Sequence, residues 1–171
     1  MPLSEFTVAG ALVESEAGVL LVQNRRRNGA IEWSTPGGVI DATDASLLAG
    51  LAREVEEETG LLVADWEGPL YEVRALAEDL GWSLRCEVHR ALAFEGALHV
   101  DDPDGIVVDA AFCGPDDWGA LLGPCAPWVR EPLLDWLAER WGPDAHRAYT
   151  YDVFGARRDE MRVVRTSPAH G

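Results

Sequence analysis

The chain has 171 residues, of which 47% are hydrophobic and 26% are charged, which is the composition of one globular domain. This composition excludes a disordered, collagen-like or low-complexity chain. Its 14 basic residues, all arginines, stand against 30 acidic residues and give a net charge of −16. A chain this acidic repels polyphosphate backbones, so we expect no non-specific binding to nucleic acid and none to anionic membranes.

The three cysteines, Cys86, Cys113 and Cys125, are widely spaced and form neither a disulfide framework nor a paired metal motif. No apolar run approaches the roughly 20 residues of a membrane helix, and the first residues lack the features of a signal peptide. We therefore expect a cytoplasmic protein with reduced cysteines.

The first half of the chain begins with two apolar, partly β-branched segments, residues 6–13 and 19–23, which predict strands. The polar turn between them suggests that they pair as a hairpin. Residues 24–29 form a loop, and Pro36 and two glycines interrupt the segment that follows. The clearest helix spans residues 47–59, with apolar residues at three- and four-residue steps and Gly60 at its end.

The second half predicts strands at residues 61–65, 71–76, 84–94 and 107–112, and helices at residues 115–122 and 128–141. Residues 149–153 and 161–165 are expected to pair as a terminal hairpin around Gly155. This order of elements, with mostly antiparallel strand signals, indicates an α/β (α+β) fold or a layered α/β/α sandwich.

Three glutamates, Glu54, Glu57 and Glu58, share one face of the 47–59 helix because they stand three and four residues apart. Clustered carboxylates repel one another unless a cation neutralises them, and Mg²⁺ prefers such oxygen ligands. The same stretch also fits a solvated acidic helix face. Gly50 lies one turn earlier on the acidic side, and its missing side chain suggests room for a ligand.

The surroundings of these acids resemble the Nudix hydrolase signature, G-x5-E-x7-R-E-U-x-E-E-x-G-U, in which U is a bulky aliphatic residue. The matching positions are Gly38, Arg53, Glu54, Val55, Glu57, Glu58, Gly60 and Leu61. The segment from Arg53 to Leu61 matches without a gap.

The match has two departures. Asp44 replaces the first glutamate of the signature, and eight residues rather than seven separate it from Arg53. The extra residue falls in the loop before the helix, where an insertion is tolerated best, and it leaves the helical acids in register.

The resemblance implies an α/β/α sandwich with a mixed sheet over residues 1–142, with residues 143–171 as a C-terminal hairpin extension packed on the same domain. It further implies metal-dependent hydrolysis of a diphosphate linkage, with Mg²⁺ or Mn²⁺ as the cofactor. By resemblance Glu54, Glu57, Glu58 and Gly38 belong to the metal site, and Arg53 pairs with the glutamates and holds them. The general base is either a glutamate of the helix or a later acid: Asp101, Asp102, Asp104 or Asp109.

Substrate-binding candidates are weaker. Arg25 and Arg27 could donate to phosphate, although such a run also fits an exposed hairpin tip. Asp104 lies in the acidic loop, and Phe112 and Asp116 occupy a region where Nudix proteins often recognise the base. The tryptophans at 128, 136 and 141 favour core or interface positions.

The substrate expected from the resemblance is a small nucleotide of the nucleoside triphosphate, ADP-ribose or nucleotide-sugar type. Two other functions stay open. The departures at Asp44 would also fit a catalytically weak nucleotide-binding sensor or interaction module, and an unrelated acidic protein could match by accident. The resemblance also allows a homodimer, to which the terminal hairpin could contribute an edge.

Overall fold

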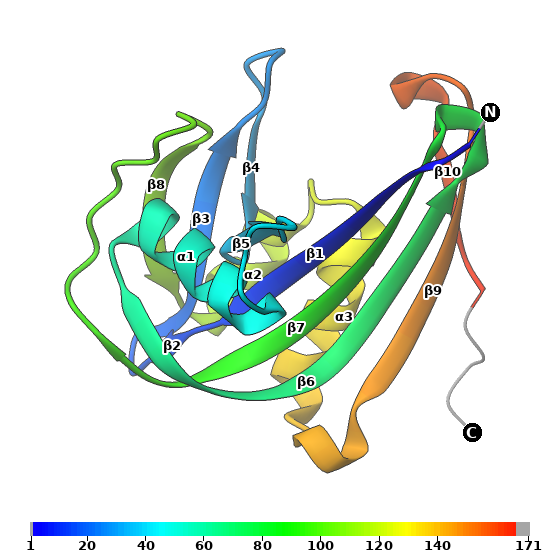
Figure 1. Ribbon diagram of the computed structural model, residues 1–171. Coiled ribbons are helices and arrows are strands. Elements are labelled where there is room, and N and C mark those ends of the chain that lie inside the picture. The colour runs from blue at the N-terminus through cyan, green and yellow to red at the C-terminus, as the bar shows by residue number, and fades with distance from the viewer. Residues whose placement is uncertain (1, 167–171) are drawn as a thin grey trace.

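The computed structural model describes residues 2–166 as an α+β fold in which two sheets and the helices pack into layers (Figure 1). The larger sheet has six strands and is mixed. Its order is β10 (Arg162–Arg165), β9 (Arg147–Phe154), β6 (Leu62–Ala77), β7 (Trp82–Glu95), β1 (Ser4–Leu12) and β5 (Gly37–Val39). The pairs β1–β7 and β6–β9 are parallel, and the remaining neighbours are antiparallel.

The smaller sheet is antiparallel and contains β2 (Glu14–Ser15), β3 (Gly18–Arg25), β4 (Ile31–Ser34) and β8 (Val107–Cys113). The predicted hairpin of residues 6–13 with 19–23 is therefore wrong, because β1 and β3 belong to different sheets. The turn is real, but the short strand β2 forms the hairpin with β3. Alternating hydrophobicity indicates that a segment is a strand, but it does not indicate which other strand pairs with it.

The helices are α1 (Leu47–Thr59), α2 (Pro115–Leu122) and α3 (Pro127–Glu139), with single-turn 3₁₀ helices at Glu78–Leu80, Pro143–Ala145 and Arg158–Glu160. The predicted bounds of α1 are confirmed. Its start is fixed by the Ser46 hydroxyl, which accepts from the Ala49 N–H at 3.0 Å, and Gly60 ends it in the left-handed conformation. No helix of residues 2–166 is long and apolar enough to cross a membrane.

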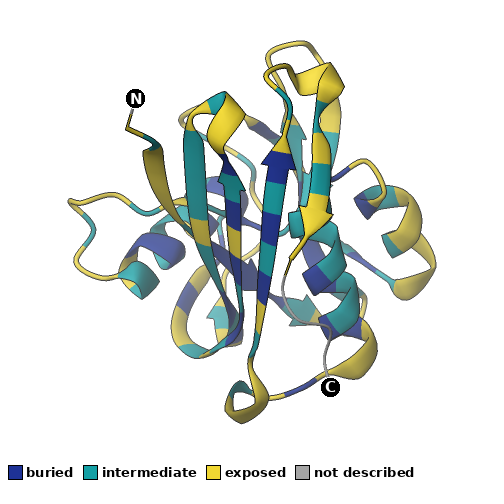
Figure 2. Cartoon of the chain, turned by 90° about the vertical axis from the view of Figure 1, so that its right-hand side faces the viewer, coloured by how far each residue is buried: buried dark blue, intermediate teal, exposed yellow. Residues whose placement is uncertain are grey.

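The hydrophobic core lies on both faces of the larger sheet. Alternate residues of β1 point to opposite faces, so Ala9 and Ala11 pack with α1, whereas Leu12 joins the cluster that α3 covers. Figure 2 shows buried residues on the strands and on the inner sides of the helices, and exposed residues on the turns.

The C-terminal strands continue the larger sheet. The terminal hairpin is confirmed by antiparallel pairing of β9 with β10, and β9 lies parallel to β6. Tyr149, Tyr151 and Val153 of β9 are buried in the main core. The predicted strands at 61–65 and 71–76 are one strand, β6, with register irregularities between Glu67 and Tyr71.

Candidate active site

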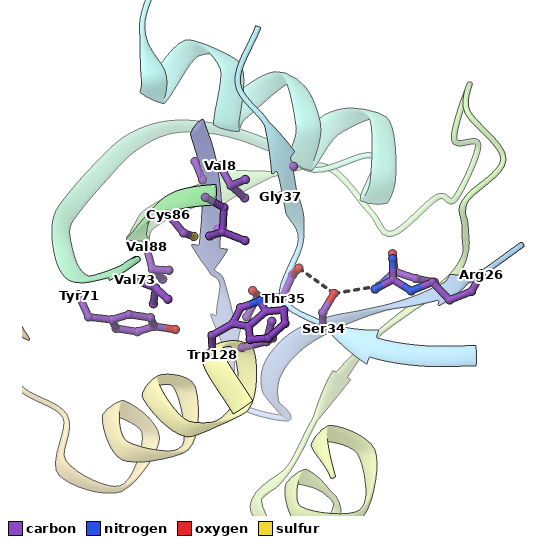
Figure 3. Close-up of a pocket in the computed structure, with 16 residues that line it drawn as sticks. Val8, Arg26, Ser34, Thr35, Gly37, Tyr71, Val73, Cys86, Val88 and Trp128 are labelled. Atoms are coloured by element: carbon purple, nitrogen blue, oxygen red, sulfur yellow. Dashed lines mark hydrogen bonds between the residues drawn. The ribbon is translucent and has the colours of Figure 1, made fainter. Parts of the chain in front are cut away.

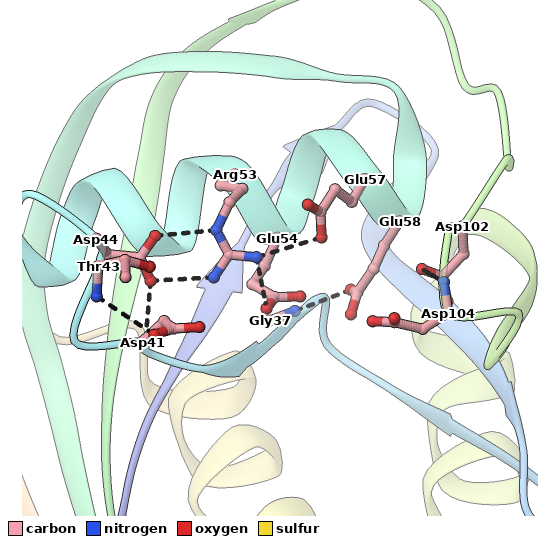
Figure 4. A network of polar contacts seen from close by, with 10 residues as sticks. All are labelled: Gly37, Asp41, Thr43, Asp44, Arg53, Glu54, Glu57, Glu58, Asp102 and Asp104. Atoms are coloured by element: carbon pink, nitrogen blue, oxygen red, sulfur yellow. Dashed lines mark hydrogen bonds and ion pairs between the residues drawn. The ribbon is translucent and has the colours of Figure 1, made fainter.

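The three glutamates of α1 face the strand β5, which lies across the helix (Figure 4). Glu58 is only 8% exposed, and its carboxylate accepts a hydrogen bond from the Gly37 N–H at 3.0 Å. Burial raises the pKa of Glu58 to about 8, and the neighbouring charges of Glu54, Asp102 and Glu57 act in the same direction, against the Gly37 hydrogen bond. Burial also raises the pKa of Glu54, although Arg53 opposes the shift.

The close approach of β5 to the helix depends on two glycines. A Cβ at Gly37, whose φ is +149°, would lie 2.1 Å from the Ala9 carbonyl oxygen, so no other residue fits there. A Cβ at Gly38 would lie 2.9 Å from the Glu54 carboxyl carbon. The two glycines therefore place backbone groups directly against the acids of α1.

Arg53 joins the acids into one network. Its guanidinium donates to Glu54 at 3.1 Å and to Glu57 at 3.3 Å, so it contacts two of the three helical glutamates. It also donates to both carboxylate oxygens of Asp44, at 2.9 and 3.0 Å. The hydrogen bonds from Arg53 hold the pKa of Asp44 below its usual range.

Asp44 reaches Arg53 across the surface of α1 at Gly50. A Cβ on Gly50 would lie 2.7 Å from the nearer Asp44 carboxylate oxygen and 3.0 Å from the Ile40 side chain. The expectation that Gly50 leaves room for a ligand is therefore wrong, because Asp44 and Ile40 occupy that space. The Asp44 carboxylate also accepts from the Asp41 N–H at 2.8 Å, which folds the lengthened loop back on itself.

The acidic loop between β7 and β8 lies near the glutamates. Asp102 organises this loop, since its carboxylate accepts from the backbone N–H groups of Asp104, Ile106 and Val107. The Asp104 carboxylate points toward Glu58 (Figure 4). Asp101 is exposed, and Asp109 accepts from the adjacent Ala110 N–H. Among the four loop and strand acids, Asp104 is therefore the one aimed at the helical glutamates.

A cavity of about 400 Å³ adjoins the acids through Gly37 and Gly38 (Figure 3). Its walls come from β1, β6, β7 and the first turn of α3, and most of them are apolar. Polar side chains enter from β3, from β4 and from the segments that follow these two strands, and they are Asn24, Arg26, Ser34 and Thr35. Trp128 stands beside the cavity, with its ring against that of Trp82 at 5.8 Å.

The predicted substrate-binding residues are scattered. Arg25 and Arg27 are exposed and do not line the cavity, whereas Arg26 lines it and pairs with Glu32 at 2.7 Å. Phe112 stacks on Phe94 with ring centres 6.0 Å apart.

Asp116 is exposed in the first turn of α2. Sequence reasoning missed Tyr71 and Trp128 as cavity residues, because both carry the pattern of core residues. Trp136 and Trp141 are buried in the core, as predicted.

A divalent cation would find the right kind of ligand at this site, since the carboxylates of Glu54, Glu57, Glu58 and Asp104 are hard oxygen donors. Within residues 2–166 no three His, Cys, Asp or Glu side chains converge closely enough to hold a metal ion. Glu54 and Glu57 are instead paired with Arg53, and Glu58 with the Gly37 N–H.

Known proteins resemble this chain in both sequence and structure. The Mycobacterium tuberculosis protein named "Putative 8-oxo-dGTP diphosphatase 2" is 32% identical over 119 residues, which are 63% of this chain and 84% of the relative. The MutT NUDIX hydrolase from Burkholderia pseudomallei superposes with a TM-score of 0.54 at 26% identity, covering 63% of this chain and 81% of that one.

The E. coli ORF135 protein shares the fold more closely, with a TM-score of 0.64 at 20% identity over 81% of this chain and 94% of its own. The model of the NUDIX domain matches residues 5–137, which is most of the chain and includes the acidic helix, the loop before it and the cavity. The chain therefore belongs to the Nudix hydrolase family.

Proposed function

We propose that this protein hydrolyses a diphosphate linkage in a nucleoside triphosphate, with an oxidised purine such as 8-oxo-dGTP as the first candidate substrate. The observation that carries the proposal is the contact between an acidic helix and a largely apolar cavity through Gly37 and Gly38. A nucleotide presents the same two chemistries side by side, a charged phosphate chain and a planar base. The name of the M. tuberculosis relative supports the choice of the oxidised purine.

We propose Glu54, Glu57, Glu58 and the backbone of Gly38 as the residues that hold Mg²⁺ or Mn²⁺. When bound, the cation would neutralise phosphate oxygens and acidify a water molecule. The burial of Glu58 supports this assignment, because this carboxyl among other acids keeps its proton when no cation is bound, as its raised pKa indicates, and a cation would stabilise the ionised form.

Arg53 and Asp104 receive different roles in this proposal. Arg53 positions Glu54 and Glu57 from one side of the helix, and Asp44 in turn fixes the guanidinium with two hydrogen bonds. Asp104 acts as the general base, since its carboxylate is aimed at the glutamates from an adjacent loop. It accepts a proton from the attacking water.

The decisive experiment measures hydrolysis of 8-oxo-dGTP and dGTP to nucleoside monophosphate and pyrophosphate, and of ADP-ribose to AMP and ribose 5-phosphate, with Mg²⁺ and with EDTA. Glu57→Gln keeps the size of the side chain and removes its charge. We expect hydrolysis that needs the metal and falls by at least about a hundredfold in this variant. Glu56→Gln is the matched control, because Glu56 is an exposed neighbour outside the network. Metal-independent hydrolysis, or equal rates in both variants, would contradict the proposal.

The sensor alternative rests on the departures at Asp44. The two hydrogen bonds from Arg53 to Asp44 support the enzyme instead, because the shorter acid still makes a two-point contact with the arginine. We also propose that residues 143–171 are an extension of the same domain, on the basis of the pairing of β9 with β6.

A further inference from the structure

Tyr71 lies on the wall of the cavity that β6 provides, opposite the entering polar residues of β3 and β4. The side chain is 3% exposed, and its hydroxyl points into the cavity toward Trp128 (Figure 3). Within residues 2–166 this hydroxyl has no hydrogen-bond partner, and its oxygen is accessible from the cavity, since His89 Nδ1 is the one fully buried side-chain polar atom there without a partner. An unpartnered hydroxyl on an almost fully buried side chain, open only toward the cavity, is available to a polar atom of whatever fills that cavity.

The ring of Tyr71 is held in place by the core behind it. Trp141 and Tyr149 each contact it edge to face, with ring centres 6.3 and 6.1 Å away. The hydroxyl therefore stays at one position on the cavity wall. Burial raises the pKa of Tyr71 well above its usual value, so the group keeps its proton and can donate.

Three of the four other polar side chains of the cavity, those of Asn24, Arg26 and Ser34, already have partners. The Asn24 amide N–H groups donate to the Ser34 hydroxyl at 2.9 Å and to the Glu32 carbonyl at 3.4 Å. Arg26 is paired with Glu32. The cavity wall around Tyr71 is largely apolar and includes Val73, Leu84 and Val88.

We infer that the Tyr71 hydroxyl is a specificity-determining group that donates a hydrogen bond to an acceptor atom on the edge of the substrate's base. This inference rests on the proposed function and deepens it. The base would lie in the apolar cavity beside Trp128, with its phosphates toward Gly37 and Gly38. A purine carbonyl or ring nitrogen at the far edge satisfies the hydroxyl, and a base with no acceptor there leaves it unpaired.

The test is Tyr71→Phe, which removes the oxygen and keeps the ring and its packing. With 8-oxo-dGTP and Mg²⁺ we expect KM to rise about tenfold and kcat to change less than twofold, because this contact is the same in the bound substrate and the transition state. Tyr151→Phe is the matched control. Its hydroxyl donates to Glu131 away from the cavity, so its KM should equal that of the wild type.

The kinetic and binding arms separate the inference from the proposed function. Equal KM values for the wild type and Tyr71→Phe would overturn the inference while leaving the hydrolase intact. If the wild type hydrolyses no nucleotide, the proposed function fails, and binding of 8-oxo-dGMP, followed by tryptophan fluorescence, decides the role of Tyr71. A dissociation constant about tenfold weaker in Tyr71→Phe supports that role, whereas equal constants or no binding by the wild type overturn it.

Discussion

The carboxylate of Asp44 fills the space into which a side chain on Gly50 would project, 2.7 Å from the missing Cβ. Gly50→Ala should therefore push Asp44 away from Arg53 and lower kcat about tenfold, the usual cost of disturbing a residue that orients a metal ligand. Helix propensity favours alanine by about 1 kcal/mol, so the variant should not melt much below the wild type. Steady-state kinetics and thermal unfolding check the two effects separately.

A double-mutant cycle with Asp44→Ala isolates this contact. Once Asp44 is shortened, Gly50→Ala should cost no further activity and should add up to about 1 kcal/mol of stability. An equal loss of activity from Gly50→Ala in both backgrounds would show that the glycine acts on something other than Asp44.

Glu58→Gln should stabilise the metal-free protein and abolish its activity. The folded-state pKa of Glu58 is raised from the ordinary 4.5 to about 8, so the folded state binds an extra proton between these values. Stability therefore falls as pH rises from 4.5 to about 8 and is constant above it. Glutamine does not titrate, so its free energy of unfolding lacks this decrease. The difference in free energy of unfolding between the variant and the wild type should therefore grow over the same pH range to about 2–4 kcal/mol.

Urea unfolding at several pH values in EDTA checks the Glu58 prediction. Adding Mg²⁺ should then raise the Tm of the wild type and leave that of Glu58→Gln nearly unchanged, because only the wild type keeps the full set of carboxylates. A difference in free energy of unfolding between the two proteins that does not change with pH would contradict the cause assigned to the pKa shift of Glu58.

Asp104→Asn should lower kcat by about a hundredfold or more and leave KM within about twofold, because the amide cannot accept the proton of the attacking water. Asp101→Asn, an exposed acid of the same loop, is the control and should behave as the wild type. The comparison uses initial rates with 8-oxo-dGTP. If both variants keep full kcat, the base belongs to the helix instead.

Tyr151→Ala should destabilise the whole protein by about 3–5 kcal/mol, since the side chain is fully buried in the main core. If residues 143–171 belong to the same domain, the variant keeps a single unfolding transition at a lower Tm. Arg158→Ala, at an exposed position of the same segment, should leave the Tm unchanged. Two separate transitions in calorimetry would show that the extension is an independent unit.

The acidic helix could be predicted from the sequence because its signals are local. Its apolar spacing, its cap and Gly60 all lie within one segment, and the structure confirms its bounds. The pairing of β1 could not be predicted, since its neighbours β5 and β7 come from distant parts of the chain. Contacts of that kind depend on packing rather than on local pattern.

The cavity could not be predicted from the sequence for a related reason. Tyr71 alternates with Val73 and Ala75 along β6, which is the pattern of any buried strand face. Only the arrangement of β6, β7 and α3 shows that this part of the strand face borders an open space rather than packed side chains. The role of Asp44 likewise depends on the loop conformation, which brings a shorter acid to the same arginine.

The edge-to-face contact of Tyr149 with Tyr71 links the C-terminal strand β9 to the wall of the cavity in which we propose that the base binds. The family match covers residues 5–137, so β9, which supports the Tyr71 ring through Tyr149, lies outside it. Under that proposal, substitutions in β9 would tilt the Tyr71 ring and change base selectivity while leaving the acidic helix unchanged.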